Sequence, residues 1–117
     1  MRIFAALIAL LLISATDVGA AEVWRVTAYD ACKKCCGKTD GITASGRKAV
    51  VGRTVACNWL PFGTRLRIDG RIFIVEDRGA KSLFGSKTNN IRHVDVFMDS
   101  HKLALAFGSQ YLTVEIL

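Results

Sequence analysis

Short segments in which apolar and polar residues alternate make up most of the chain. Six of them are rich in β-branched and aromatic residues, as β-strands are, and they span residues 23–29, 54–57, 64–68, 72–76, 91–97 and 111–117. Glycines separate these segments, and Asp69-Gly70 between two of them predicts a tight hairpin turn. The pattern predicts an all-β fold, mainly β with one short helix, whose strands form a closed or nearly closed barrel.

One segment near the C-terminus has helical spacing instead. Over residues 100–107 the apolar side chains that fall on one face are Leu103, Ala104 and Phe107. Asp99 stands where an N-cap residue is expected, and Gly108 stands where a glycine commonly ends a helix. We therefore expect a helix over residues 100–107 that is capped by Asp99.

The longest predicted loop after the cysteine-rich one runs from Arg78 to Asn90. Its residues include Lys81, Gly85 and Lys87, which favour solvent exposure. Long loops in small domains are commonly functional. We expect this one to be an exposed, mobile segment beside a site.

The first twenty residues differ in composition from the rest. Arg2 precedes an uninterrupted apolar run from Ile3 to Ala15, and small residues follow at positions 18–20. This pattern predicts a secretory signal peptide over residues 1–20. A retained membrane anchor is the alternative, although the run is shorter than the about 20 apolar residues that span a bilayer. We expect a secreted or periplasmic monomer without a stable membrane anchor, in which residues 21–117 form one domain.

The charge balance is strongly basic, with 16 Lys and Arg against 10 Asp and Glu and a net charge of +6. Removal of residues 1–20 takes away one charge of each sign, so the excess stays. A basic exported domain favours an anionic partner, such as a cell-wall polymer, membrane headgroups or nucleic acid. No nucleic-acid-binding motif is visible, so we do not expect that partner. The basic residues around the cysteine-rich loop and the loop after it are Lys33, Lys34, Lys38, Arg47 and Lys48.

Four cysteines remain in the predicted mature domain, namely Cys32, Cys35, Cys36 and Cys57. An even number in an exported chain predicts two disulfides. A bond between the adjacent Cys35 and Cys36 would be strained, so we expect Cys57 to pair with one of them and Cys32 with the other. A structural zinc site built from the thiolates is the alternative. His93 and His101 make a poor ligand set, so neither a metal nor another cofactor is expected.

The motifs TAYDACKKCCGKTDGITASGRKAVVGRTVAC, LPFGTRLRI, VEDRG, HVDVFMDS and ALAFG follow one another in the chain. In this order they resemble the three-aspartate (3D) domain of bacterial and phage cell-wall proteins. The resemblance covers nearly all of residues 21–117, and its three aspartates would be Asp77, Asp95 and Asp99. It implies a six-stranded double-psi β-barrel, related to that of membrane-bound lytic transglycosylase A and of rare lipoprotein A.

The resemblance also implies an activity. It points to a peptidoglycan lytic transglycosylase that cleaves the β-1,4 bond between MurNAc and GlcNAc in the glycan strands. The alternative is an expansin-like or barwin-like protein that binds wall polysaccharide without cleaving it. A third possibility is an interaction module that borrows the fold. Asp95 matches the position at which the lytic transglycosylase A family places its catalytic aspartate.

The chemistry agrees with a single acid at Asp95. A hydrolase commonly needs two carboxyl groups, whereas a lytic transglycosylase can use one, first as general acid and then as general base. Alternation along residues 91–97 places His93, Asp95 and Phe97 on one face, away from Val94 and Val96. Desolvation beside Phe97 is expected to raise the pKa of Asp95, so that it holds a proton near neutral pH.

For each of the other candidate residues, both a functional role and a purely structural role are possible. Asp77 is the second predicted catalytic residue. It could orient Asp95, bind a sugar hydroxyl or only satisfy the backbone amides of a turn. The charge of the adjacent Arg78 is expected to keep Asp77 ionised. Asp99 is either a substrate contact or only the helix cap. The resemblance implies further substrate contacts at Thr27, Tyr29, Thr43, Ser45 and His93. Ordinary packing or turn formation is the alternative for each of these.

Overall fold

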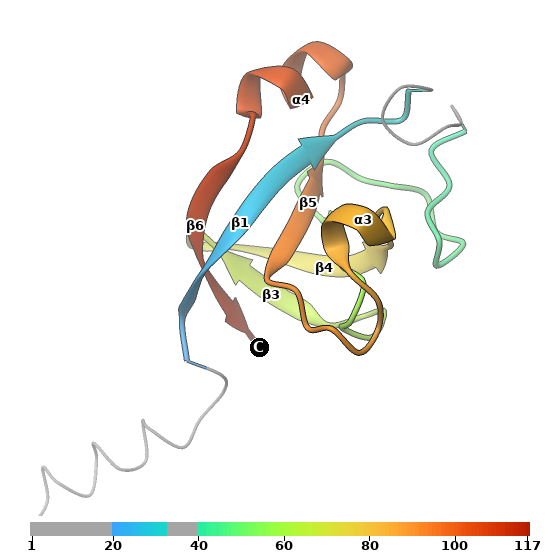
Figure 1. Ribbon diagram of the computed structural model, residues 1–117. Coiled ribbons are helices and arrows are strands. Elements are labelled where there is room, and N and C mark those ends of the chain that lie inside the picture. Colours follow the sequence, from blue (N-terminus) through green and yellow to red (C-terminus); the bar gives the residue numbers. More distant parts are fainter. Residues whose placement is uncertain (1–19, 33–39) are drawn as a thin grey trace, which may run out of the picture.

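The computed structural model describes residues 20–32 and 40–117, and in them the chain forms a closed six-stranded β-barrel (Figure 1). The strands are β1 (Glu22–Tyr29), β2 (Thr54–Ala56), β3 (Arg65–Ile68), β4 (Arg71–Asp77), β5 (His93–Phe97) and β6 (Gln110–Ile116). Two short helices accompany them in this part of the chain, α3 (Lys81–Phe84) and α4 (His101–Phe107). The predicted mainly β barrel is confirmed.

The strands follow the order β1-β5-β2-β4-β3-β6 around the barrel, and β6 closes it by pairing with β1. Two neighbouring pairs are parallel, β1 with β5 and β2 with β4, and the others are antiparallel. The parallel pairs join segments that are far apart in the sequence. The outer face of the β1–β5 pair therefore combines residues from both ends of the domain.

Alternation along the strands separates a dry interior from an outer face. On β5, Val94 and Val96 are buried in the barrel core, while His93, Asp95 and Phe97 point to the other face, as the pattern predicts. The interior is filled mainly by branched aliphatic side chains and Trp24. Its other members are Val26, Val55, Cys57, Leu60, Leu66, Ile68, Phe73, Val75 and Val114.

The turn and cap signals are confirmed in part. Asp69 and Gly70 both have positive φ, 49° and 83°, and connect the antiparallel β3 and β4 as the predicted hairpin turn. The predicted cap of α4 is wrong by one residue, because the Ser100 side chain, and not that of Asp99, accepts the Leu103 N–H at 3.2 Å. Asp99 is exposed, and both residue types cap helices well, so the sequence pattern alone does not separate them.

The face of α4 also differs from the prediction at one position. Ala104 is buried, but the Leu103 side chain is half exposed. A helix of only seven residues presents a single turn to the barrel, so there is room for only part of the predicted apolar face. Gly108 ends the helix with a φ of 66°, as predicted.

The segment predicted as an exposed loop after Arg78 contains α3, and its Phe84 is only 4% exposed. Asn58 fastens this segment to the barrel. Its Nδ2 donates to the Gly79 and Gly85 carbonyls, and its Oδ1 accepts the Gly79 N–H at 2.8 Å. The segment is therefore partly a packed element, because a buried amide and a buried ring hold it down.

The cysteine prediction needs one correction. Cys57 is a free thiol that is completely buried in the barrel core, so the expected bridge from Cys57 to Cys35 or Cys36 is not formed. Its side chain packs among the residues of the barrel core. Cys35 and Cys36 lie outside the described residues, as do Lys33, Lys34, Lys38 and the predicted signal peptide up to residue 19. Within the described ranges, no helix has the length and apolar character needed to cross a bilayer.

Candidate active site

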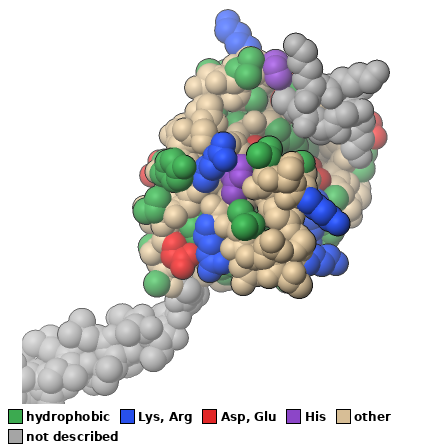
Figure 2. All heavy atoms as spheres, in the orientation of Figure 1, with side chains coloured by type: hydrophobic (Ala, Val, Ile, Leu, Met, Phe, Trp, Pro, Cys, Tyr) green, Lys and Arg blue, Asp and Glu red, His purple; other side chains and the backbone are tan. Residues whose placement is uncertain are grey.

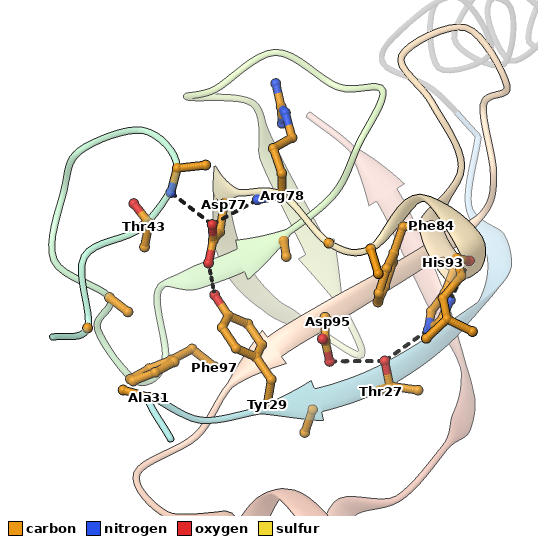
Figure 3. Close-up of a pocket in the computed structure, with 18 of the residues that line it drawn as sticks. Thr27, Tyr29, Ala31, Thr43, Asp77, Arg78, Phe84, His93, Asp95 and Phe97 are labelled. Atoms are coloured by element: carbon orange, nitrogen blue, oxygen red, sulfur yellow. Dashed lines mark hydrogen bonds between the residues drawn. The ribbon is translucent and has the colours of Figure 1, made fainter. Parts of the chain in front are cut away.

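A cleft of about 660 Å³ lies on the outer face of the β1–β5 pair. Its floor follows the parallel register, in which Arg25 pairs with His93, Thr27 with Asp95 and Tyr29 with Phe97. Side chains two residues apart on a strand share a face, so three cross-strand pairs line the floor in a row. Residues 41–44 and 77–84 contribute the walls (Figure 3).

Asp95 is the partly buried carboxyl at the centre of this floor. Its backbone is flanked by Thr27 on β1 and by the small Ala56 on β2. Burial raises the pKa of Asp95 to about 6, the Thr27 hydroxyl opposes this by donating to Oδ1 at 3.0 Å, and the charge of Asp77 adds to the rise. The raised pKa expected from desolvation is confirmed, and it lets the group change protonation state close to neutral pH.

His93 extends this contact into a chain of hydrogen bonds. Its Nε2 lies 2.9 Å from the Thr27 hydroxyl, and its Nδ1 lies 3.1 Å from the Leu83 carbonyl. Burial lowers the pKa of His93, while the Leu83 carbonyl raises it and the charge of Arg25 lowers it further. The neutral ring is therefore favoured. Because the Leu83 carbonyl can only accept, the single proton of that ring belongs on Nδ1, which leaves Nε2 as an acceptor.

With the His93 proton on Nδ1, the direction in which the Thr27 hydroxyl donates depends on the protonation state of Asp95. When Asp95 is ionised, the hydroxyl donates to its carboxylate. When Asp95 is protonated, the acid can donate to Thr27 Oγ1, and the hydroxyl proton then turns to His93 Nε2 at 2.9 Å. One hydroxyl thus bonds Asp95 in both of its protonation states without movement of heavy atoms, and it donates to His93 only when Asp95 is protonated.

Asp77 lies on the opposite wall, and its carboxylate already accepts three hydrogen bonds (Figure 3). The Tyr29 hydroxyl donates to Oδ2 at 2.7 Å, while the backbone N–H groups of Ala44 and Arg78 donate to Oδ1 at 2.8 and 2.9 Å. Asp77 and Asp95 both pair with Ala56 of β2, so one strand separates their backbones by about 10 Å. Asp77 therefore positions Tyr29 and the loop of Ala44.

The Arg78 guanidinium, whose charge was expected to act on Asp77, does not contact that carboxylate. It turns away and donates to the carbonyls of Cys57 and Leu60 at 2.6 and 3.0 Å, over the ring of Phe62. Two carbonyl acceptors and an aromatic face satisfy the cation there. Only the backbone N–H of Arg78 contacts the Asp77 carboxylate.

The wall around α3 brings in a residue that the sequence pattern did not indicate. The Phe84 ring stacks on the His93 imidazole, with their centroids 4.1 Å apart. Gly79 passes so close to this ring that a Cβ at Gly79 would lie 2.3 Å from Phe84 Cδ2. Phe84 thereby shields His93 from water, and its role could not be read from an isolated aromatic in a loop.

The wall across the cleft from α3 is the loop of residues 41–47, which is anchored to the barrel. Thr43 is buried and lines the cleft, and its hydroxyl bonds the Arg47 carbonyl at 2.7 Å and the Ser45 hydroxyl at 2.8 Å. The buried Glu76 holds this loop further, because its backbone carbonyl accepts the Ser45 N–H. Its Oε2 lies 2.7 Å from Arg47 Nη1 outside hydrogen-bond alignment, which makes that contact Coulombic.

Six of the predicted site residues come together in the cleft: Thr27, Tyr29, Thr43, Asp77, His93 and Asp95. Ser45 stands behind Thr43 and does not line the cleft, and Asp99 lies outside it. Tyr29 is only 7% exposed and packs edge-on against Phe97, which leaves little of its ring for a ligand. Arg25 joins the floor without having been predicted, since its only sequence signal is the shared strand face.

Comparison of the sequence with protein-family models finds no matching model, and comparison with curated proteins finds no matching sequence. The resemblance to the 3D domain therefore stays a prediction that rests on the quoted motifs.

Proposed function

We propose that this protein is a lytic transglycosylase of the 3D type, which cleaves the MurNAc–GlcNAc bond of peptidoglycan on a double-psi β-barrel. The observation that carries the proposal is Asp95, a partly buried carboxyl on the floor of a cleft, with its pKa raised to about 6. The two parallel strand pairs within a closed six-stranded barrel support the double-psi topology.

The reaction needs one carboxyl group that acts twice. Protonated Asp95 donates its proton to the glycosidic oxygen as the bond between that oxygen and the anomeric carbon of MurNAc breaks. Ionised Asp95 then takes the proton of the MurNAc C6 hydroxyl, whose oxygen bonds to the anomeric carbon. The products are a free GlcNAc hydroxyl and a 1,6-anhydro-MurNAc end. No water is consumed, and Asp95 ends protonated as it began.

Thr27 and His93 fit this double role. The Thr27 hydroxyl stabilises ionised Asp95 by donating to it, and it turns to His93 Nε2 when Asp95 carries its proton. Asp77 acts on Asp95 through its charge, which adds to the rise of the Asp95 pKa, while its oxygens accept hydrogen bonds from Tyr29, Ala44 and Arg78. A hydrolase would need a second carboxylate that activates a water, and Asp77, whose oxygens already accept three hydrogen bonds from the protein, is less suited to that role than a carboxylate open to solvent.

The charge of the molecule suits a wall polymer with carboxylates on its peptide stems. Arg25 lines the cleft floor and is exposed. Figure 2 shows further Lys and Arg side chains on the face that carries α3. Electrostatic attraction of an anionic glycan to this face would raise its local concentration at the cleft.

The test is digestion of purified sacculi by the protein and by Asp95→Asn, with mass analysis of the released muropeptides. We expect anhydro-MurNAc ends from the wild type and a loss of about 10²–10⁴-fold in the variant. Asp69→Asn, in the exposed hairpin turn, is a matched control that keeps full activity because Asn suits its positive φ.

The other outcomes separate the alternatives. Reducing ends would indicate hydrolysis and contradict the proposed reaction. Retention of the protein on sacculi without released sugar would make it a wall-binding protein of the expansin or barwin kind. Failure to bind sacculi at all would remove peptidoglycan as the substrate.

A further inference from the structure

A second group of reactive side chains lies outside the cleft, where the end of β1 meets the start of α4. Asp30 follows β1 directly, Cys32 comes two residues later, and His101 is the first residue of α4. Asp30 is buried, whereas Cys32 and His101 are partly exposed. None of the three lines the cleft, and the proposed reaction does not use them.

The three side chains bring one oxygen, one sulfur and one nitrogen together. Cys32 Sγ lies 3.0 Å from Asp30 Oδ1 and 3.4 Å from His101 Nδ1, and that nitrogen lies 3.3 Å from Asp30 Oδ1. In a tetrahedral zinc site, bonds of about 2.0–2.3 Å place neighbouring ligand atoms about 3.3–3.6 Å apart. Two of the three separations already match this range closely, and the third needs a shift of a few tenths of an ångström.

We propose that Asp30, Cys32 and His101 bind one Zn²⁺ ion. Thiolate, imidazole and carboxylate are the three ligand types that zinc takes in proteins. A thiolate in the set disfavours Mg²⁺ and Ca²⁺, which prefer oxygen ligands alone. The three residues fill three positions of a tetrahedral ion, and a fourth ligand completes it.

The position of this site gives the ion a structural role. It would join the segment after β1 to the first turn of α4, two elements that already pack on each other. β1 also carries Thr27 and Tyr29 of the cleft floor. A bound ion therefore fixes the end of the strand from which those two side chains project, without taking part in the reaction at Asp95.

The experiment loads the full chain with Zn²⁺, removes the excess by gel filtration and measures bound metal by elemental mass spectrometry. We expect one ion per chain in the wild type and at least about tenfold weaker binding in each of Asp30→Asn, Cys32→Ser and His101→Gln. Asp69→Asn is the matched carboxylate control and keeps the metal. Equal binding by the wild type and the Cys32→Ser variant would overturn the site.

Cobalt gives a second readout that depends on the ligand and not on stability. Co²⁺ in the same site should show thiolate-to-metal charge-transfer absorption in the wild type and in Cys57→Ala, and none in Cys32→Ser. If a ligand variant does not fold, removal of zinc from the wild type decides the matter, because a chelator should lower the melting temperature and added Zn²⁺ should restore it. An unchanged melting temperature, or Cys32 found in a disulfide in metal-free protein from an exporting host, would overturn the proposal.

Discussion

Asp95 shows how one residue takes its chemistry from its neighbours. Its pKa of about 6 results first from burial, and Thr27 and Asp77 adjust it in opposite directions. Under the proposed reaction the first step needs the protonated acid, so activity should fall about tenfold for each pH unit above about 6. Rates of muropeptide release measured from pH 4 to pH 9 would show this decrease as the descending limb of the pH–rate profile. A flat profile across pH 6 would contradict Asp95 as the acid.

Variants of the two neighbours should move that limb in opposite directions. Thr27→Val removes a donor that stabilises ionised Asp95, so the limb should shift to higher pH, while Thr27→Ser keeps the hydroxyl and serves as the control. Asp77→Asn removes a negative charge, so the limb should shift to lower pH. Shifts in the same direction for both variants would show that the change comes from altered packing and not from charge.

The same pKa has a consequence for stability. Because the folded-state pKa of Asp95 is raised above its ordinary value of 3.8, the folded state holds the proton more tightly than the unfolded chain. The stability contributed by the protonated form is complete below about pH 4 and is lost as the pH rises through about 6. Asp95→Asn, which stays neutral, should therefore unfold at a melting temperature several degrees higher than wild type at pH 8.

The pKa shift of Asp95 also sets the size of the expected stability difference between the wild type and Asp95→Asn, and the pH at which that difference should vanish. A shift of about two pKa units corresponds to on the order of 2–3 kcal/mol for a partly buried group. At pH 4 the melting temperatures of wild type and Asp95→Asn should nearly coincide. An equal difference at pH 4 and pH 8 would trace the gain to packing and not to titration.

At the scale of elements, the contact between Gly79 and α3 sets one wall of the cleft. An added Cβ would lie 2.3–2.8 Å from three atoms of the Phe84 ring, so Gly79→Ala should push this ring off His93. We expect a loss of about 1–3 kcal/mol in the free energy of unfolding, as for other overpacked sites. Denaturant unfolding measures it. The double variant Gly79→Ala/Phe84→Ala should lose less unfolding free energy than the sum of the losses in the two single variants, because the clash is absent without the ring. Equality of the two quantities would contradict the clash.

The strands could be predicted from the sequence, and α3 could not. Alternation is a local signal, and the buried Val94 and Val96 against the outward His93 and Asp95 follow it directly. The position of α3 depends instead on Asn58, which lies more than twenty residues before it in the chain. No local pattern reports such a long-range contact. The cap at Ser100 was missed for a different reason, because two adjacent residues were equally suitable caps.

The candidate site was predictable in its residue types and only partly in its arrangement. The shared face of His93, Asp95 and Phe97 follows from strand spacing alone. The residues of β1 that lie beside this face are brought there by a parallel pairing between strands more than sixty residues apart in the sequence. Only the family resemblance, and no local pattern, predicts that pairing. Cys57 was misassigned because counting cysteines gives no information on which of them face the core.

At the scale of the whole molecule, the net charge of +6 should govern association with the anionic cell wall that the proposed function requires. Attraction between exposed charges weakens as the Debye length falls from about 10 Å at 0.1 M salt to about 3 Å at 1 M. We therefore expect retention on sacculi to decrease steeply between 0.05 and 0.5 M NaCl in a pull-down measurement. Retention that is independent of salt would indicate that contacts in the cleft, and not overall charge, hold the protein on the wall.

The strand order of the barrel also makes the surroundings of Asp95 depend on pairing between distant parts of the chain. β1 finds its partners in β5 and β6, so the cleft floor forms only when the first strand meets the final third of the chain. Pairing over such separations is slow compared with local structure formation. Until it happens, Asp95 is an ordinary solvated carboxylate that has lost its proton at neutral pH. Under the proposed reaction, the chain would acquire its acid only when the barrel closes, so partly folded molecules should be inactive.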